Sequence, residues 1–596
     1  MTAGKDGKWK LSLDPMQSPG PFQLIVKGKN TIALNNVLIG EVWICSGQSN
    51  MEWSVQNSKD PEKEIANARY PQIRHIKIPS NISGQPQEDI TDAAWQICSP
   101  ETVSDFTAVG YFFARELMGE TNVPVGLINT SWGGTHVETW ISRDAFEGSE
   151  EFRSMIASMG EINLDSMQRK NEEAIVKRIE GLQGSLAAST EVIEQWKDLS
   201  FDDSSWPLMK IPGLWEGQSP GNIDGVVWFR KRFSVTAENA GREATLDLGF
   251  IDDADETFVN GVSVGGVNDY TQKRSYKIPA GLLREGKNII AVRVEDTAGG
   301  GGFYGAAGDM KISTEKGFDS LSGEWAYQVE SLAEGNADVS PNQFPTLLFN
   351  SMVNPLIPFT IRGALWYQGE SNARRAFQYR KAFPLMINDW RKQWGQGDFP
   401  FYFVQLASFN YDNGNSNSGS AWAELREAQT LTLSLPNTGM VVTTDIGDAD
   451  DIHPRNKQDV GKRLASLALH DLYGKKIVSG GPVYQSMKKE GNKIILSFTN
   501  AGSGLTVKDK YGYLKGFEIA GDDRKFYFAQ AYVEGNSVVV YHEAVSNPVS
   551  VRYGWADDAS DNNLFNIEGF PAGPFRTDSW TGITGDSKFK VGLNFQ

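Results

Sequence analysis

Residues 37–51 read VLIGEVWICSGQSNM, an apolar run that ends in small and polar residues. The run predicts a buried β-strand over 37–45, and the glycine after it predicts a turn. Ser49 therefore lies just past the carboxyl end of a strand. That is where α/β enzymes place a nucleophile.

The segments around this stretch alternate between strands and helices. Apolar spacing predicts a helix over 105–120 and a strand over 123–129. The alternation resumes near residue 325. It predicts strands at 361–367, 399–406 and 440–444 and helices at about 373–395 and 457–473. The fold class is therefore α/β, with a parallel sheet.

Two stretches depart from this alternation. From about 199 to 318 the sequence holds short alternating strands, with Asn260-Gly261 as a hairpin turn, which predicts an all-β sandwich or jelly roll. Short strands recur from 478 to about 580. The expected domains are an N-terminal β segment (1–36), an α/β domain in two parts (37–198 and 325–477), a β insertion (199–318) and a C-terminal β domain (478–596).

Composition excludes several classes of protein. The 596 residues carry a formal net charge of −17, which argues against nucleic acid or an anionic membrane as a partner. No apolar run reaches the ~18 residues of a spanning helix, and the N-terminus shows no apolar signal segment. Cys45 and Cys98 are the only cysteines, so a disulfide framework and cysteine–zinc spacing are both absent. We expect neither a metal nor a cofactor.

Small and hydrogen-bonding residues follow four of the predicted α/β strands. The segments are GQSN at 47–50, TSWGGT at 130–135, QGESN at 368–372 and DDIH at 450–453. Open parallel sheets bind ligands beyond the carboxyl ends of their strands. Taken alone, each glycine pair is typical of an ordinary turn between a strand and a helix. Their occurrence together with a serine and a histidine favours a functional site.

A serine nucleophile needs a base, and the chain has five histidines. His75 lies in an alternating stretch, His470 in a predicted helix and His542 in a predicted strand. His136 follows the glycine turn and is an alternative base. His453 is the best candidate, because it lies in a loop beside carboxylates and ahead of a helix.

Asp450 and Asp451 are both candidates for the acid that orients His453. A carboxylate fixes the tautomer of an imidazole and stabilises the imidazolium. Spacing leaves both open, and the alternative is a solvated acidic run that caps the following helix. Glycine backbone amides and the amide of Gln368 can donate hydrogen bonds to a developing oxyanion.

Two matches to known motifs are rejected. GVSVG at 261–265 fits GxSxG, but it runs from a hairpin turn into a strand, so Ser263 lacks the strand–turn–helix setting of a nucleophile. GGGFYG at 300–305 fits GxGxxG without a following helix. The 17 tryptophans include four near the predicted site segments. Aromatic faces pack on sugar rings, although core packing is the alternative for most of them. These four are Trp53, Trp132, Trp140 and Trp366.

Four ordered motifs resemble the sialate O-acetylesterase family, which belongs to the SGNH (GDSL-like) hydrolases. They are GEVWICSGQSNM at 40–51, SWGGT at 131–135, WYQGESN at 366–372 and IHP at 452–454. The resemblance covers nearly the whole chain and includes an insertion that looks like the jelly-roll carbohydrate-binding fold of β-glycosidases. It implies an SGNH-hydrolase-like three-layer α/β domain around a parallel sheet.

The resemblance also implies roles for individual residues. Ser49 would be the nucleophile and His453 the base, while the superfamily pattern DxxH points to Asp450 and relatives often carry Asp at position 451. The oxyanion hole would use the amides of Ser49 and of Gly133 or Gly134, with Gln368 where most relatives have asparagine and Asn372 as the alternative. The residues expected to contact substrate are Gln48, Asn50, Trp132, Glu370 and Asn372.

The implied activity is metal-independent removal of O-acetyl groups from sialic acid through an acetyl-enzyme. One alternative is the same chemistry on acetylated xylan or another plant glycan. Another is a glycan-binding protein without catalysis. The expected partner is an O-acetylated carbohydrate. A periplasmic or secreted location is expected by analogy with relatives that act on glycans.

Overall fold

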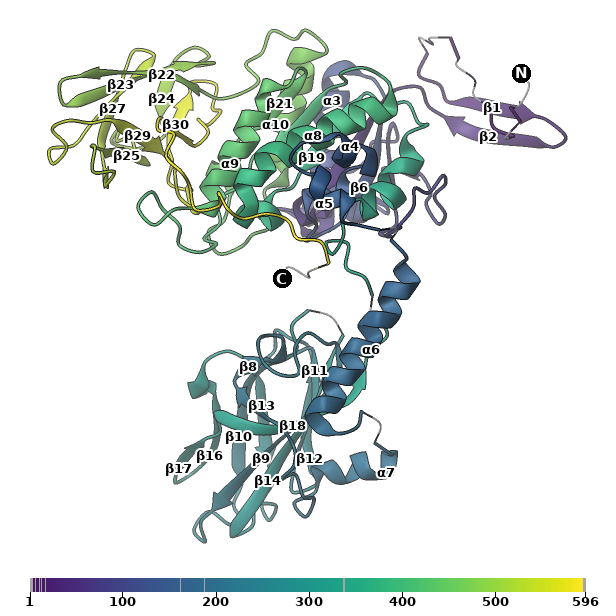
Figure 1. Cartoon of the computed structure of the whole chain (residues 1–596), viewed down its shortest axis with the longest axis vertical. Coiled ribbons are helices and arrows are strands. Elements are labelled where there is room, and N and C mark those ends of the chain that lie inside the picture. Colours follow the sequence, from purple (N-terminus) through teal and green to yellow (C-terminus); the bar gives the residue numbers. More distant parts are fainter. Residues whose placement is uncertain are drawn as a thin grey trace. The chain divides into compact units, whose positions relative to one another are not determined.

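The computed structural model describes residues 4–592 apart from residues 6, 10, 12, 15, 17, 161, 187, 298, 336 and 337. The chain divides into two compact units (Figure 1). The first comprises Met1–Ile162 and Ser340–Gln596, and the second comprises Asn163–Val339. The first unit carries every residue predicted for the active site.

The first unit is built on a seven-stranded sheet with the order β21-β20-β19-β3-β6-β4-β5. Neighbouring strands pair in parallel, apart from the antiparallel pair of β4 and the edge strand β5. The strands are β3 (Glu41–Gly47), β4 (Ile73–Lys77), β5 (Gln96–Ile97), β6 (Val125–Ser131), β19 (Gly363–Tyr367), β20 (Phe401–Val404) and β21 (Thr438–Val441). This mixed α/β architecture agrees with the predicted fold class.

Helices cover both faces of the sheet. On one face Trp43 of β3 packs against Phe113 of α3 (Ala108–Thr121), in a core that also holds Leu464 of α10 (Lys457–Asp471). On the other face Trp366 of β19 packs against Phe383 of α8 (Ala376–Trp394). Successive residues of a strand point to opposite faces, so a doubly covered strand buries all of them. This explains the unbroken apolar run at 42–45.

Strand β3 lies where the order of the sheet reverses. The chain builds β4, β5 and β6 on one side of β3 and later adds β19, β20 and β21 on the other. The loops leaving β3 and its neighbours therefore diverge, which opens a crevice at the carboxyl ends of the strands. Ser49 begins helix α1 (Ser49–Glu52) at this crevice.

The predicted strand over 37–45 is divided in the structure. Residues Thr31–Val37 form β2, which pairs with β1 (Phe22–Lys27) in an N-terminal hairpin. Strand β3 begins only at Glu41. The remaining helices of this unit are α2 (Pro61–Ala66), α4 (Arg143–Gly148), α5 (Arg153–Ala157) and α9 (Ala421–Leu431).

The C-terminal part of the first unit consists of short antiparallel strands around a core of their own. One sheet has the order β22-β23-β28-β27, a second β26-β25-β29-β31, and β24 pairs with β30. The bounds are β22 (Val483–Glu490), β23 (Lys493–Thr499), β24 (Leu505–Val507), β25 (Phe517–Ala520), β26 (Phe526–Phe528), β27 (Gln530–Glu534), β28 (Ser537–Tyr541), β29 (Ser550–Tyr553), β30 (Leu564–Asn566) and β31 (Phe575–Arg576).

The second unit contains helix α6 (Leu164–Gln183), the short helix α7 (Thr190–Ile193) and two antiparallel sheets around one core. The first sheet comprises, in order, β12 (Val262–Asn268), β11 (Ala254–Val259), β14 (Gly286–Asp296), β9 (Gly225–Val235), β18 (Gly323–Leu332) and β7 (Leu208–Ile211). The second comprises β17 (Gly317–Ser320), β16 (Met310–Thr314), β10 (Ala244–Asp252), β15 (Gly302–Tyr304) and β8 (Gly213–Leu214), with β13 (Arg274–Ile278) paired to β10.

The second unit begins at Asn163 rather than near residue 199, where the sequence pattern changes. The reason is helix α6, whose Ile179 is fully buried in the core between the sheets. The predicted hairpin turn is present, because Asn260-Gly261 joins β11 to β12 with both residues at positive φ. The jelly-roll topology stays a prediction.

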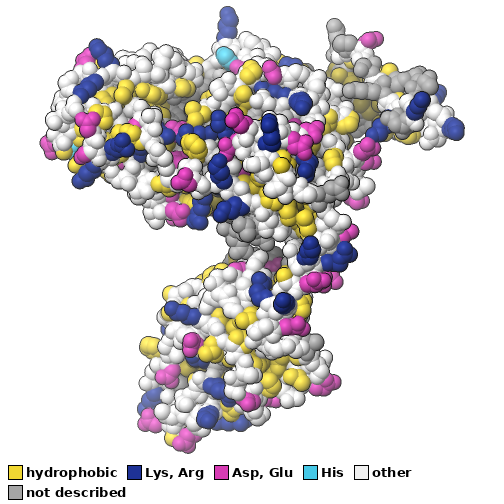
Figure 2. Space-filling model, viewed as in Figure 1, with side chains coloured by type: hydrophobic (Ala, Val, Ile, Leu, Met, Phe, Trp, Pro, Cys, Tyr) yellow, Lys and Arg dark blue, Asp and Glu magenta, His cyan; other side chains and the backbone are white. Residues whose placement is uncertain are grey.

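The surface carries charges of both signs. Figure 2 shows acidic and basic side chains interspersed over the visible face, with apolar side chains between them. Within the described residues, no helix has both the length and the hydropathy needed to cross a bilayer.

Candidate active site

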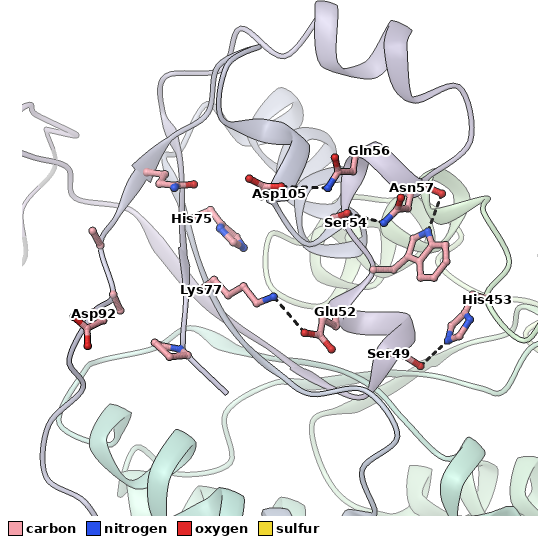
Figure 3. A pocket seen from close by; sticks show the side chains of 15 residues that line it. Ser49, Glu52, Ser54, Gln56, Asn57, His75, Lys77, Asp92, Asp105 and His453 are labelled. Carbon is pink, nitrogen blue, oxygen red and sulfur yellow. Dashed lines mark hydrogen bonds and ion pairs between the residues drawn. The ribbon is translucent and has the colours of Figure 1, made fainter. Parts of the chain in front are cut away.

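Ser49 and His453, which lie 404 positions apart in the sequence, meet above the carboxyl end of β3. Ser49 is the first residue of α1, and His453 lies in the loop that precedes α10. The Ser49 Oγ and His453 Nε2 atoms are 2.9 Å apart, as drawn in Figure 3. This is the hydrogen-bond geometry that a serine and its general base require.

The structure distinguishes the two candidate acids. Asp451 Oδ1 lies 3.9 Å from His453 Nδ1 and accepts a hydrogen bond from the backbone N–H of His453 at 2.8 Å. Asp450 is exposed, and its backbone N–H donates to Asp448 Oδ1. At 3.9 Å Asp451 acts through charge rather than through a direct hydrogen bond to the ring. The geometry favours Asp451 as the carboxylate that supports His453.

An aromatic face and a cation both act on the imidazole of His453. The Trp53 ring stacks on it with the ring centroids 4.8 Å apart and the planes 14° apart. Burial lowers the pKa of His453, the Lys457 ammonium lowers it further, and the Asp451 carboxylate opposes both. The environment therefore favours the neutral imidazole, which is the form that accepts a proton from serine.

Asn50 connects the helix that carries Ser49 to the loop that carries His453. Its Nδ2 donates to Glu370 Oε1 at 2.7 Å and to the backbone oxygen of Ile452, next to His453, at 3.0 Å. Its Oδ1 accepts a hydrogen bond from Lys457 Nζ. Sequence reasoning did not identify Lys457. The available signal was a lysine four residues after His453, at the first residue of the predicted helix.

Gly133 lies beside the serine. A Cβ added to this glycine would lie 3.3 Å from Ser49 Cβ, so only a residue without a side chain fits without displacement. The backbone N–H of Gly133 donates to Glu52 Oε2 at 2.8 Å. Gly134 is exposed and has a φ of +71°. Glu52 was also missed, although its position three residues after Ser49 places it on the same helical turn.

The predicted oxyanion donor Gln368 is engaged elsewhere. Its Nε2 donates to the backbone oxygen of Thr135 at 3.0 Å and to Asn372 Oδ1 at 2.7 Å. The Nδ2 of Asn372 in turn donates to Glu138 Oε2. Both side chains thus brace the turn that follows β6. The assignment of Gln368 or Asn372 to the oxyanion hole stays a prediction that no contact in the structure supports.

The other residues predicted to contact substrate are turned inward. Gln48 Oε1 accepts hydrogen bonds from the backbone N–H groups of Gly369 and Ser371, and burial raises the pKa of Glu370. Gln48, Asn50 and Glu370 are buried, and none of them is among the described residues that line the cavity. They bond to one another's segments on either side of Ser49, so their direct contact with substrate stays a prediction.

The aromatic residues near the site have different roles. Trp140 and Trp366 are buried and pack edge to face with their ring centroids 6.0 Å apart. Trp132 is half-buried. Trp53 lines the cavity. The alternative base His136 is buried against Phe589, and burial lowers its pKa to about 4.

Ser49 and His453 open onto a cavity of about 810 Å³. Its wall includes the carboxylates Glu52, Asp92 and Asp105, and Lys77 is the only Lys or Arg among the described residues that line it. Lys77 Nζ lies 3.2 Å from Glu52 Oε1. The charged groups on the cavity wall are thus mainly acidic, with one cationic group among them (Figure 3). In the described part of the chain, no group of three or more His, Cys, Asp and Glu side chains could hold a metal ion.

Comparison with known proteins gives concordant results. The chain is similar in sequence to curated sialate O-acetylesterases. The protein from Mus musculus is 24% identical over 92% of this chain and 79% of its own length, and that from Rattus norvegicus is 24% identical over 83% and 69%. A solved carbohydrate acetylesterase from Xanthomonas citri is 28% identical, covers 96% of this chain and 89% of its own, and superposes with a TM-score of 0.62.

A family model described as carbohydrate esterase, sialic acid-specific acetylesterase matches residues 39–181 and 336–470. The matched ranges contain the Ser49 segment, the Gly133 turn and the His453 loop, and they leave out most of the second unit. The α/β part of the chain, which contains Ser49 and His453, matches the sialic acid-specific acetylesterase family of carbohydrate esterases.

Proposed function

We propose that this carbohydrate esterase uses Ser49 as a nucleophile to remove O-acetyl groups from sialic acid through an acetyl-enzyme. The observation that carries the proposal is the 2.9 Å contact between Ser49 Oγ and His453 Nε2 on the wall of a cavity. A serine with only a structural role would not require a neutral imidazole within hydrogen-bonding distance.

In the first half of the reaction, His453 Nε2 takes the Ser49 proton as Oγ attacks the acetyl carbonyl carbon. The negative charge of Asp451 stabilises the imidazolium that forms. The carbonyl oxygen becomes an oxyanion, to which the backbone N–H groups of Ser49 and Gly133 donate. When the tetrahedral intermediate collapses, the bond to the sugar oxygen breaks and that oxygen takes the proton from His453.

In the second half, water replaces the sugar. His453 takes a proton from a water molecule, the hydroxide attacks the acetyl carbonyl, and the bond to Ser49 Oγ breaks. Oγ recovers its proton from His453, and acetic acid leaves. The same imidazole therefore serves as base and then as acid in both halves.

Lys77 supports sialic acid as the substrate. Sialic acid is an anionic sugar, and an ammonium group on the cavity wall can pair with its carboxylate. The relatives from Mus musculus and Rattus norvegicus are both named sialate O-acetylesterase.

A neutral acetylated glycan such as acetylated xylan is the second candidate. Glu52, Asp92 and Asp105 surround Lys77, and their negative charges disfavour an anionic sugar. The similar solved structure is described as a carbohydrate acetylesterase, without reference to sialic acid. A glycan-binding role without catalysis lacks comparable support, because the serine, the histidine and a carboxylate are all in bonding or charge-pairing positions.

The nucleophile is tested with Ser49→Ala on p-nitrophenyl acetate. We expect the turnover number to fall by at least about 10⁴-fold. Ser263→Ala is the matched control, because Ser263 fits a nucleophile motif but lies on β12 of the second unit. Full turnover by the Ser49 variant would overturn the proposal.

The substrate is tested by measuring acetate released from O-acetylated sialic acid and from acetylated xylan. Release from the sialic acid alone supports the first candidate, and release from the xylan alone supports the second. Lys77→Met sharpens the comparison. It should raise KM for the anionic sugar more than KM for the neutral glycan, because only the anionic sugar loses a charge partner.

A further inference from the structure

The backbone N–H of Gly133, a proposed oxyanion donor, already has an acceptor. Glu52 Oε2 accepts its hydrogen bond at 2.8 Å. The same glycine lies against the serine, since its added Cβ would be 3.3 Å from Ser49 Cβ and 3.4 Å from Glu52 Oε2. A carboxylate oxygen therefore occupies the position beside the nucleophile where an acyl oxygen needs a donor.

The second oxygen of Glu52 faces Lys77, and Figure 3 shows this pair on the same cavity as Ser49 and His453. The ion pair between Glu52 and Lys77 can separate. The side chain of Glu52 is 29% exposed and that of Lys77 50% exposed, and exposed ion pairs contribute little to stability. The carboxylate of Glu138, by contrast, is buried against Arg375 in the same unit. Glu52 can therefore leave Gly133 without unfolding its surroundings.

The resting contact and the reaction exclude one another. An oxyanion hole stabilises the transition state only when its donors lie about 2.7–3.1 Å from the developing negative oxygen. While Glu52 accepts the Gly133 hydrogen, that oxygen lacks the donor and also meets a like charge. Turnover requires the carboxylate to give up the N–H group.

We propose that Glu52 is an internal competitor for the oxyanion hole, displaced by the acyl oxygen of the substrate in each catalytic cycle. The inference rests on the serine mechanism proposed above. It makes Glu52 a specificity-determining residue. A sugar ester that fills the cavity and hydrogen-bonds Lys77 draws the ion pair apart as it binds. A small ester such as p-nitrophenyl acetate makes no such contacts and must displace the carboxylate unaided.

The test is steady-state kinetics of Glu52→Ala and Glu52→Asp. Both changes remove the oxygen from Gly133, and the aspartate keeps the charge but is shorter by one methylene. We expect kcat/KM for p-nitrophenyl acetate to rise about 10-fold in both variants, since restoring an oxyanion donor reverses part of the ~10²–10³-fold cost of lacking one. The rise in kcat/KM for an O-acetylated sugar should be smaller, because that substrate already displaces Glu52.

Glu52→Gln and Glu120→Ala serve as controls. The glutamine keeps an oxygen within reach of Gly133. The rise in kcat/KM for p-nitrophenyl acetate should therefore be smaller in Glu52→Gln than in Glu52→Ala. Glu120 pairs with Lys475 at the same 3.2 Å as Glu52 with Lys77, but it lies on α3 and does not line the cavity. Glu120→Ala should therefore leave kcat/KM within 2-fold of the unmodified protein.

A second readout is inactivation by an organophosphonate ester, whose phosphoryl oxygen needs the same donors. The second-order rate constant should rise with kcat/KM in the alanine and aspartate variants. An unchanged or lower kcat/KM in folded Glu52→Asp, verified by its thermal unfolding, would overturn the inference. Ser49→Ala in the same series distinguishes a failure of the serine mechanism from a failure of the competition by Glu52. Activity remaining in that variant refutes the mechanism, whereas a flat Glu52 series with inactive Ser49→Ala refutes only the competition.

Discussion

Lys457 presents a buried ammonium group close to the residue that follows Ser49. Its Nζ donates to Asn50 and lies 5.7 Å from the centre of the Trp53 ring and 5.4 Å from that of Tyr367. Burial lowers the pKa of Lys457 to about 7, although the carboxylates of Glu370 and Asp451 oppose this. A group that titrates near neutrality and lies close to the base should affect the pH profile of the enzyme.

We expect Lys457→Met to move the acidic limb of the kcat/KM profile to higher pH. Lys457 is one of the causes that lower the pKa of His453, so its removal raises that pKa. His453 must be neutral to act as a base, and a higher pKa means that it becomes neutral only at higher pH. Activity at pH 6 should then fall more than activity at pH 8.

The control for Lys457→Met is Lys462→Met, an exposed lysine on the same helix. Its acidic limb should coincide with that of the unmodified protein. An acidic limb that stays in place in folded Lys457→Met would contradict the role of the ammonium group.

Asp450 and Asp451 should differ strongly in their effect on turnover. Asp451→Asn removes the negative charge 3.9 Å from His453 Nδ1, and we expect kcat to fall about 10²-fold. Asp450→Asn changes an exposed side chain and should leave kcat within about 2-fold. The measurement is kcat for p-nitrophenyl acetate in both variants. The reverse order of effects would assign the supporting carboxylate to Asp450.

The sequence supports some of these roles better than others. The segments after the strands and the elimination among five histidines were enough to pair Ser49 with His453. The same segments did not reveal which way a polar side chain points. Gln48, Asn50 and Glu370 belong to the most distinctive motifs, yet they bond one another's segments rather than line the cavity. Their orientation depends on hydrogen-bond partners more than 300 positions away.

At the scale of secondary-structure elements, the turn between β3 and α1 positions the serine. Gly47 has a φ of +134°, a region that L-residues with side chains rarely adopt. A Cβ there would also lie 2.2 Å from the backbone oxygen of Tyr367 in the neighbouring strand β19. Both conditions require glycine at the residue where the strand ends.

We therefore expect Gly47→Ala to destabilise the protein by at least about 2 kcal/mol and to lower kcat for p-nitrophenyl acetate, because the turn that carries Ser49 has to shift. Thermal unfolding and steady-state kinetics measure the two effects. Gly119→Ala in α3 is the matched control. No atom lies within 4 Å of its added Cβ, and alanine favours a helix by roughly 0.5–1 kcal/mol. Equal stability of the two variants would contradict the strain at Gly47.

Periodicity predicted the existence of elements more accurately than their ends. The helix expected over 105–120 is α3 (Ala108–Thr121), whose Thr107 side chain caps the first turn by accepting from the Gly110 N–H. The apolar run over 37–45 predicts one strand. In the structure Val37 ends β2 and Glu41 begins β3, because the chain changes partner between them. A change of pairing partner does not alter the hydrophobic pattern of the sequence.

At the scale of the whole molecule, the boundary of the inserted unit shows where composition misleads. The sequence pattern assigns residues 37–198, which include helix α6, to the α/β domain. Ile179 of α6 is nevertheless buried in the core of the second unit. Strand β18 lies beyond residue 318 and pairs with β9 from Ala326↔Arg230 to Leu332↔Gly225. The sequence pattern identifies the β-rich stretch but not the helix and strand that complete its core.

The contrast between these boundaries predicts the behaviour of two fragments. The fragment 163–339 contains every member of both buried clusters of the second unit, so it should fold alone and unfold in one cooperative transition.

The fragment 199–318 lacks β18, whose Trp325, Tyr327 and Val329 are almost fully buried. At roughly 1.5–3 kcal/mol for each large buried side chain, their loss is about as large as the ~5–15 kcal/mol that stabilises a domain. Without β18, strand β7 also loses its partner in the sheet. Circular dichroism and thermal unfolding of the two fragments should therefore show one folded and one unfolded chain. A cooperative transition in fragment 199–318 would mean that α6 and β18 are peripheral to the core.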